Sequence, residues 1–416
     1  MTDRDATPEL VCYRCGETTA FPDRKRCECG EPLWFDVNAT EFDWTDGNPS
    51  GIWRYADLLP VAPVEGVGTA AGDTPLVRAE RLDDYAGCRL WLKDESENPT
   101  GSFKDRGSAV GVAWAAAAGR EWVGTVSHGN MAISVAAHAA GTDMGTEAAD
   151  ATEDSPDAVV LVPDDISGER LAAIAQYDPT VLRIAGDYGD LYYETLAADS
   201  PVEFVNSDTP LRVAGQKTTA LEVCEAFALD STLPNAPDAL VLPVSSGGHA
   251  SAAWKALREL RTAGLLGDDE LPRLYLVQAA ACDPIAEAYR EGAEEVTPVE
   301  AAETVAYSIA NSDPPSGTRA LAAARETDGA VLSVSDEEIL DAKAALAQKA
   351  GFCVEPASAT TVAGIRRLTD SGELGADESA VAVLTGTGFR ELDAEGADPE
   401  TISLADLPER LRTLGN

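Results

Sequence analysis

The feature that most restricts the fold is an alternation, past residue 50, of short β-branched runs with alanine-rich stretches of helical period. Such alternation is typical of parallel strands joined by helices that cover both faces of a sheet. We therefore expect an α/β protein. The expected strands are 89–93, 122–126, 159–162, 181–184, 202–205, 240–244, 274–277 and 381–384, and the expected helices are 109–118, 131–140, 167–176, 188–198, 214–228, 250–262, 336–350 and 358–369.

The length of 416 residues suffices for two or three domains with a sizeable core. One stretch interrupts the alternation, because residues 142–157 are acidic and almost without apolar side chains. A helix-to-strand connection normally needs only a few residues. We expect an acidic, solvated surface insertion here.

The charge of the chain is extreme, with 72 acidic and 31 basic residues and a formal net charge of -41. Such a surface repels phosphate backbones, which excludes nucleic acid as a partner. Scarce lysine and abundant carboxylate are typical of a protein in a high-salt cytoplasm, where molar ions shorten the Debye length to about 3 Å. An acidic protein of an ordinary cytoplasm is the alternative.

No apolar run approaches the ~20 residues of a membrane span, and the polar start of the chain has no signal-peptide pattern. We expect a cytoplasmic protein without a membrane partner. Thiols stay reduced in that compartment, so cysteines are metal ligands or core residues there. The dispersed Cys88, Cys224, Cys282 and Cys353 fit small core residues.

Four cysteines cluster near the N-terminus, as Cys12-x-x-Cys15 and Cys27-x-Cys29, and a glycine follows each pair. Two tight turns that present four thiolates suit a tetrahedral structural zinc, and a segment this short could not otherwise bury enough surface to fold. The C-x-C half departs from the commoner C-x-x-C spacing. A metal-free turn is therefore the alternative.

The ten residues 98–107, Asn-Pro-Thr-Gly-Ser-Phe-Lys-Asp-Arg-Gly, place Lys104 on a turn just before an expected helix. Unpaired backbone N–H groups and the positive end of the helix dipole disfavour an ammonium at that place. They favour the neutral amine that attacks a carbonyl. Lys104 is thus a candidate nucleophile.

Three further motifs each follow an expected strand, where open α/β sheets bind ligands. Ser127-His128-Gly129-Asn130 follows strand 122–126, and Leu384-Thr385-Gly386-Thr387-Gly388 ends the last strand. Ser245-Ser246-Gly247-Gly248-His249 follows strand 240–244 and precedes a helix. Its small residues let backbone N–H groups close on a phosphate.

Together with segments 206–218 and 351–359, these motifs resemble the threonine synthases, which are pyridoxal-phosphate enzymes of fold type II. The resemblance implies a fold like that of the tryptophan synthase β subunit, with two doubly wound parallel-sheet domains and an N-terminal zinc ribbon. The expected division is 1–45 for the ribbon, 46–104 with 216–416 for the large domain, and 105–215 for the small domain.

The resemblance also implies roles for single residues. Lys104 would hold the cofactor covalently, Asn130 would bind its 3′-oxygen, and Thr385 would face its pyridine nitrogen. Its phosphate would lie on the loop 245–249. The implied cofactor contacts are Phe103, Lys104, Asn130, Ser245, Ser246, Gly247, Gly248, His249 and Thr385, and the implied substrate contacts are Ser127, His128, Gly129, Met131, Asp187 and Asn206.

The chain departs from the family pattern on the substrate side. Met131 stands where the family has threonine, Asp187 where it has an amide, and Tyr193 about where an arginine is expected. With a dielectric of about 20, a carboxylate 4 Å from a phosphate costs roughly 4 kcal/mol per charge. Arg183 or Arg212 could compensate.

The resemblance implies a lyase that converts O-phosphohomoserine and water to threonine and phosphate, in a monomer or homodimer. One alternative is a β-eliminating or β-replacing enzyme, such as a threonine/serine dehydratase or a cysteate synthase. A non-catalytic pyridoxal-phosphate-binding protein is the other. Of the three histidines, His128 and His249 fall in the cofactor loops, whereas His138 lies in an alanine run and is expected to pack in the core.

Overall fold

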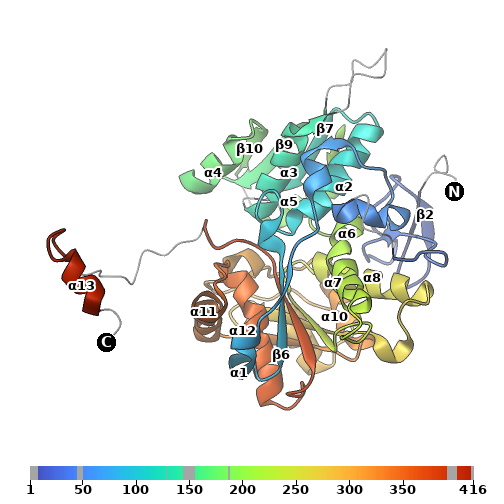
Figure 1. The fold of residues 1–416 in the computed structure, drawn as a ribbon. Coiled ribbons are helices and arrows are strands. Elements are labelled where there is room, and N and C mark those ends of the chain that lie inside the picture. Colours follow the sequence, from blue (N-terminus) through green and yellow to red (C-terminus); the bar gives the residue numbers. More distant parts are fainter. Residues whose placement is uncertain are drawn as a thin grey trace.

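The computed structural model describes residues 8–44, 50–127, 129–143, 155–185, 188–390 and 401–413. Within them, two largely parallel sheets are covered by helices, and a small antiparallel sheet lies near the N-terminus (Figure 1). The α/β architecture expected from the sequence is confirmed.

The larger sheet has six strands in the order β14-β13-β12-β15-β6-β5. The first five are parallel, whereas the edge strand β5 runs antiparallel to β6. Alternate residues pack on opposite faces, so that Leu240 and Leu242 belong to one core and Val241 to the other. The strands are β5 (Leu76–Arg78), β6 (Arg89–Asp94), β12 (Ala239–Pro243), β13 (Arg273–Ala279), β14 (Ala330–Val334) and β15 (Ser379–Leu384).

Helices lie on both faces of this sheet (Figure 1). One face packs against α7 (Thr218–Leu229), α8 (Gly248–Thr262), α9 (Pro284–Glu291) and α10 (Gly317–Glu326). The other packs against α1 (Asp83–Ala86), α11 (Asp336–Ala345) and α12 (Pro356–Asp370).

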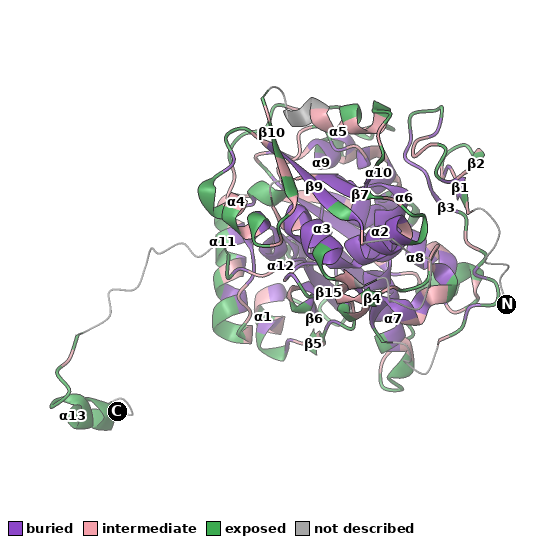
Figure 2. Ribbon diagram, turned by 90° about the horizontal axis from the view of Figure 1, so that it is seen from above, coloured by how far each residue is buried: buried purple, intermediate pink, exposed green. Residues whose placement is uncertain are grey.

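The smaller sheet is parallel throughout and has the order β10-β9-β7-β11. Figure 2 shows β10, β9 and β7 of this sheet beside α3. Its strands are β7 (Trp122–Val126), β9 (Asp157–Pro163), β10 (Thr180–Ile184) and β11 (Val202–Phe204). The neighbouring helices are α2 (Lys104–Ala117), α3 (Asn130–Ala140), α4 (Gly168–Ala175), α5 (Tyr188–Ala197) and α6 (Pro210–Gln216).

All eight expected strands are present, with ends within two residues of those expected. Among the strands and helices of the two larger sheets, β5, β14, α1, α9 and α10 have no counterpart in the expectation. β5 has only three residues, which is too short for a periodic signal, and the edge strand β14 is only partly buried. The expected helix 214–228 is wrong as a single element, because α6 and α7 meet at Lys217.

The expected start of the first long helix is also wrong, because α2 begins at Lys104 and not near residue 109. Gly107, which would ordinarily weaken a helix, lies inside it. A Cβ there would come within 2.8 Å of Arg212 Nε, and one on Gly215 within 2.1 Å of the Arg106 carbonyl oxygen. The two glycines therefore let α6 pack closely on α2.

Near the N-terminus, β1 (Glu9–Val11), β2 (Thr18–Ala20) and β3 (Trp34–Phe35) form an antiparallel sheet. We call residues 8–35, which hold this sheet and its turns, the ribbon. Figures 1 and 2 place it beside α6 and α8. Tyr13 and Trp34 both pack against Trp254 of α8, with ring centroids 5.5 and 5.3 Å away. This aromatic contact anchors the ribbon to the larger sheet's helix layer.

The remaining elements are short. β4 (Glu65–Gly66) pairs with β8 (Thr142–Asp143), so the first two residues of the expected acidic insertion form a strand, and its residues 144–154 lie outside the described residues. The segments η1–η7 are 51–58, 67–70, 80–82, 95–97, 268–270, 307–309 and 346–350, and α13 is Leu407–Thr413. Among the described residues, no helix has the length and apolarity needed to cross a membrane.

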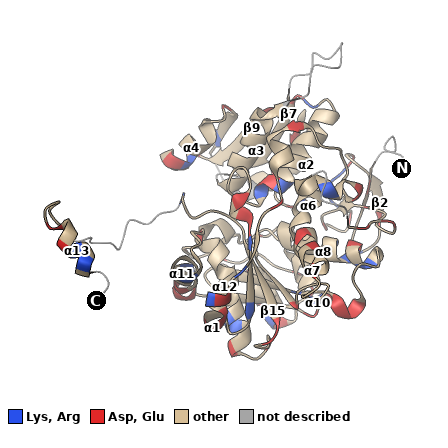
Figure 3. Cartoon of the chain, in the orientation of Figure 1, with Lys and Arg blue, Asp and Glu red and all other residues tan. Residues whose placement is uncertain are grey.

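Acidic residues lie on outer helices such as α1, α4 and α11 (Figure 3). Four residues that were expected to lie in the core are buried, namely His138, Cys88, Cys224 and Cys282. Cys353 differs, because it is only half-buried.

A buried ion-pair network joins the larger sheet to α2 and α7. The fully buried Arg106 donates through Nε to Glu95 at 2.6 Å and through Nη1 to Glu222 at 2.7 Å. Lys93 Nζ lies 2.6 Å from the same Glu222 carboxylate. Burial alone would raise the pKa of Glu222, but Arg106 and Lys93 hold that pKa well below its usual range. The charges of the network therefore depend on one another.

Replacing one partner of this network should destabilise the fold strongly. We expect Glu222→Gln to lower the free energy of unfolding by about 3–5 kcal/mol, because it leaves buried cations with too little compensating charge. Arg366→Gln, which removes an exposed pair with Asp341, should cost no more than about 1 kcal/mol. Denaturant unfolding at constant high salt measures both, and equal losses would contradict the assigned importance of the network.

Candidate active site

Lys104 is the first residue of α2 and follows the turn around Gly101, whose φ is +76°. Its Nζ lies 4.2 Å from the centroid of the Phe103 ring. Burial and then the charge of Arg212 lower the pKa of Lys104 to about 7, although Glu355 opposes the shift. A substantial fraction of this amine is therefore neutral near neutral pH, as a nucleophile requires.

Lys104 lines a cavity of about 510 Å³. The cavity lies at the carboxyl ends of strands of both sheets, because residues of its walls come shortly after β7, β11, β12 and β15. Phe103 and Lys104 follow β6 after the segment 95–102. The segment 307–315 closes another side. Of the residues singled out from the sequence, the lining includes Phe103, Lys104, Ser127, Gly129, Asn130, Met131, Tyr193, Asn206, Ser245, Ser246, Gly247, Gly248, His249 and Thr385.

Two expected substrate contacts, His128 and Asp187, lie outside the described residues. Neither of the arginines considered as compensating cations lines the cavity. Arg183 is exposed on the edge strand β10, and Arg212 is fully buried in α6, where its Nη1 donates to Ser108 Oγ at 2.7 Å. The expectation that one of them replaces the missing arginine gains no support from this geometry.

The loop 245–248 enters α8 between two other backbone segments. Gly247 is the residue before the helix and has a φ of +86°. A Cβ on Gly247 would come within 2.3 Å of the Ser316 carbonyl oxygen, and one on Gly248 within 2.2 Å of that of Ser207. Only glycine fits either place, so the loop brings its N–H groups to the N-terminus of a 15-residue helix.

His249 lies flat against Phe103, with ring centroids 4.1 Å apart and planes 11° from parallel. Its Nε2 is 3.2 Å from Thr219 Oγ1, whereas its buried Nδ1 has no hydrogen-bond partner. Burial, and then the charge of Lys104, hold the pKa of His249 well below its usual value. The imidazole is therefore neutral.

Glu355 is one of the lining residues that the sequence analysis did not name as site residues, like Tyr192, Gln216 and the segment 307–315. Its carboxylate accepts from Asn130 Nδ2 at 2.9 Å and from Thr385 Oγ1 at 3.0 Å. The side-chain oxygen of Asn130, Oδ1, accepts a hydrogen bond from Arg390 Nη1 at 3.2 Å. The sequence did carry a signal for this position, namely the dipeptide Glu355-Pro356 within segment 351–359. Proline favours the first position of a helix, and α12 begins at Pro356, so Glu355 is the residue just before that helix.

Comparison with known proteins agrees with this geometry. The family model "Pyridoxal-phosphate dependent enzyme" matches residues 67–386. The threonine synthase of Methanosarcina acetivorans is 37% identical over 402 residues, which are 94% of this chain and 93% of that protein. The threonine synthase of Methanocaldococcus jannaschii is 35% identical over 395 residues, 92% and 93% of the two chains.

The chain belongs to the threonine synthase family of pyridoxal-phosphate-dependent enzymes. The resemblance drawn from its motifs is thereby confirmed. Among solved structures, the T.th. threonine deaminase has a TM-score of 0.59 and 26% identity over 77% of this chain and 94% of that one. Serine racemase of Dictyostelium discoideum has a TM-score of 0.60 at 21% identity over 77% and 93%, and shares the fold.

The cavity residues fit pyridoxal phosphate. Its aldehyde needs an amine that is neutral near pH 7, which Lys104 provides. Its phosphate needs clustered N–H donors, which the glycine loop before α8 presents. Its ring nitrogen needs a polar partner. Two polar atoms of lining residues are candidates, namely Thr385 Oγ1 and His249 Nδ1, which has no hydrogen-bond partner.

The substrate side of this family member is mixed in character. Ser127 and Asn206 are polar lining residues, but Asn206 is already held, since its Oδ1 accepts from the Val126 amide at 2.9 Å and its Nδ2 donates to Thr195 at 2.9 Å. Met131 and Tyr193 line the same cavity. The cavity is therefore lined both by polar side chains that suit a substrate and by the two residues that differ from the family pattern.

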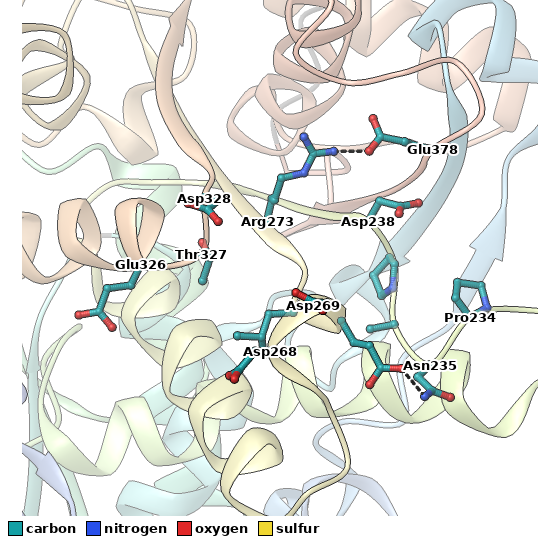
Figure 4. Close-up of a pocket in the computed structure, with 14 residues that line it drawn as sticks. Pro234, Asn235, Asp238, Asp268, Asp269, Arg273, Glu326, Thr327, Asp328 and Glu378 are labelled. Carbon is teal, nitrogen blue, oxygen red and sulfur yellow. Dashed lines mark hydrogen bonds and ion pairs between the residues drawn. The ribbon is translucent and has the colours of Figure 1, made fainter.

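A second cavity, of about 430 Å³, lies at the amino ends of the larger sheet's strands (Figure 4). Asp238, Asp268, Asp269 and Glu378 line it, and its Arg273 is paired with Glu378 at 2.6 Å. Such carboxylates would repel a phosphate ester. The catalytic candidate is therefore the cavity with Lys104, at the opposite edge of the sheet.

Proposed function

We propose that this chain is a threonine synthase, which converts O-phosphohomoserine and water to threonine and phosphate. The observation that carries the proposal is the combination, in one cavity, of the Lys104 amine, the glycine loop before α8 and Thr385. The identity to threonine synthases over more than nine-tenths of both chains supports it.

Lys104 would hold the cofactor covalently through Nζ, while residues 245–248 would bind its phosphate. Thr385 would bind its ring nitrogen by turning its hydroxyl proton from Glu355 toward the ring. When bound, pyridoxal phosphate supplies an electron sink that stabilises negative charge on the substrate's carbon atoms. A neutral hydroxyl at the ring nitrogen moderates that sink, which disfavours transamination. Asn130 would bind the 3′-oxygen, since its Nδ2 has a second hydrogen beside the one given to Glu355.

Lys104 Nζ would also move protons at the substrate's Cα and Cβ. Its pKa of about 7 suits both acceptance and release of a proton. In the proposed reaction Cβ loses a proton, the Cγ–O bond to phosphate breaks and Cγ gains a proton. The hydroxyl of water then adds at Cβ, and the remaining proton of that water leaves with the phosphate. Ser127 and Gly129 would contact the substrate carboxylate, together with His128.

A β-eliminating enzyme, such as a threonine/serine dehydratase, is the second candidate. It is favoured by Met131 and Tyr193 in the cavity lining and by the lack of an arginine among the described lining residues. A dehydratase does not need to bind a substrate phosphate, whereas a threonine synthase does. The two candidates therefore differ in the substrate consumed.

The test is incubation of the holoenzyme at high salt with O-phosphohomoserine, O-phosphoserine, serine and threonine in parallel. We expect equal amounts of phosphate and threonine from O-phosphohomoserine, and no 2-oxobutyrate from threonine. Lys104→Ala should abolish the reaction, whereas Lys349→Ala, an exposed control, should not. Formation of 2-oxobutyrate or pyruvate without phosphate release from O-phosphohomoserine would contradict the proposal.

We also propose the division into 1–45, 46–104 with 216–416, and 105–215. All strands of the four-stranded sheet fall in 105–215, and all strands of the six-stranded sheet fall outside it, which supports this division. The net charge of -41 supports a high-salt cytoplasm as the working compartment.

A structural zinc in the ribbon is a further proposal. The sulfur atoms of Cys12, Cys15, Cys27 and Cys29 lie within 4.8 Å of one another, and three of their separations are 3.5, 3.6 and 3.9 Å. Four thiolates at about 2.3 Å from a tetrahedral zinc are ~3.8 Å apart. The four thiols therefore fit that ion.

Metal analysis of protein purified without chelator should find one zinc per chain. Cys15→Ser with Cys29→Ser should abolish it, because a tetrahedral site cannot lose two ligands. The double substitution Cys88→Ser with Cys282→Ser is the control, since both thiols lie outside the ribbon. Absence of zinc from the unmodified protein would contradict the proposal.

A further inference from the structure

The ribbon touches the wall of the Lys104 cavity through one side chain. Arg26, the residue before Cys27, has Nη1 3.5 Å from the hydroxyl oxygen of Tyr192 and 3.4 Å from Asp208 Oδ2. Its Nη2 donates to the carbonyl oxygen of Pro315 at 2.9 Å. Tyr192 and Pro315 both line the cavity, so a single guanidinium reaches two of its walls from outside.

These two walls belong to different parts of the fold. Tyr192 is on α5, which packs with the smaller sheet, and Pro315 lies two residues before α10, which packs on the larger sheet. Tyr192 donates to the fully buried Asp208 at 2.5 Å, which fixes that tyrosine for Arg26. A planar guanidinium with several donors can hold both partners at one separation.

The neighbouring contacts hold the ribbon against the same segment of chain. Lys25 Nζ lies 2.6 Å from Glu203 and donates to the Phe204 carbonyl oxygen at 3.0 Å. Arg319 of α10, fully buried, donates to the carbonyl oxygens of Pro32 at 3.2 Å and Asp208 at 3.4 Å. Residues 203–208 include Asn206 and Ser207 of the cavity lining, so the ribbon buttresses that wall.

Arg26 is in turn held by the metal-binding turn. Its Nε donates to the Gly30 carbonyl oxygen at 3.0 Å, its backbone pairs with Pro32, and the next residue is the zinc ligand candidate Cys27. An ordered turn at residues 27–30 therefore holds the Arg26 guanidinium in its direction toward the cavity wall.

We propose that Arg26 is a positioning residue for the substrate, because it joins the α5 wall and the 307–315 wall of the cavity, and that the ribbon thereby sets substrate affinity. The inference rests on the proposed function for the identity of the substrate. By thermodynamic linkage, a metal that orders the turn would strengthen substrate binding, and substrate would strengthen metal binding equally.

The test compares Arg26→Gln with Arg24→Gln in the zinc-loaded holoenzyme. Among the residues that the structure describes, Arg24 forms its ion pairs with Glu17 and Glu28, both in the ribbon, and it is the matched control. We expect Arg26→Gln to speed amide hydrogen exchange in residues 191–197 and 307–315 without substrate, with cofactor absorbance and zinc content unchanged. KM for O-phosphohomoserine should rise about tenfold, as for loss of one charge-assisted hydrogen bond, with kcat within about twofold.

Arg24→Gln should leave all these quantities unchanged, and Arg26→Lys should restore part of the lost affinity. Tyr192→Phe breaks the same link without altering the ribbon, so it should raise KM even if Arg26→Gln loses zinc. Exchange rates and KM in Arg26→Gln equal to those in Arg24→Gln would overturn the inference. A protein that shows the exchange effect but no turnover of O-phosphohomoserine would refute the proposed function and leave the role of Arg26 standing.

Discussion

The position of Lys104 depends on the buried ion-pair network that Arg106 forms two residues further along α2. Its guanidinium is pinned between Glu95, after β6, and Glu222, on α7. Burial of such charges is costly unless each has its partners. Because the network satisfies them, it fixes the first turn of α2 relative to the larger sheet.

The same network shapes the turn that leads into Lys104. Glu95 also accepts from Asn98 Nδ2 at 3.0 Å, and Asp105 accepts from the amide and the hydroxyl of Thr100, each at 2.6 Å. Both flanks of the turn are therefore tied to buried carboxylates. The lysine amine is left facing the cavity, where the surroundings favour its neutral form.

Much of this could be predicted from the sequence, because strands and loops left strong local signals. The β-branched runs gave the strands, and the topology of parallel strands brings their carboxyl ends to one edge. For that reason Ser245 and Thr385, which follow strands of the larger sheet, meet in one cavity although they are far apart in the chain. Ser127, which follows β7 of the smaller sheet, lines the same cavity. The meeting of the four clustered thiols was likewise predictable, because it requires only two tight turns close together in the chain.

What the sequence could not give depends on contacts between distant elements. Gly107 looked unfavourable for a helix, and only the packing of α6 on α2 explains it. Arg212 was considered a possible substrate contact, yet it is buried in that same interface. Arg26 had no local motif of its own, because its importance arises where the ribbon meets both sides of the cavity.

The central claim is that Lys104 is the cofactor's covalent anchor. Borohydride reduction of the holoenzyme, followed by digestion and mass mapping, tests this claim directly. The account predicts one pyridoxyl group per chain, on Lys104, and none on Lys93 or Lys217, whose ammonium groups are buried in ion pairs with Glu222 and Glu259. A label on either of those lysines, or no label on Lys104, would contradict it.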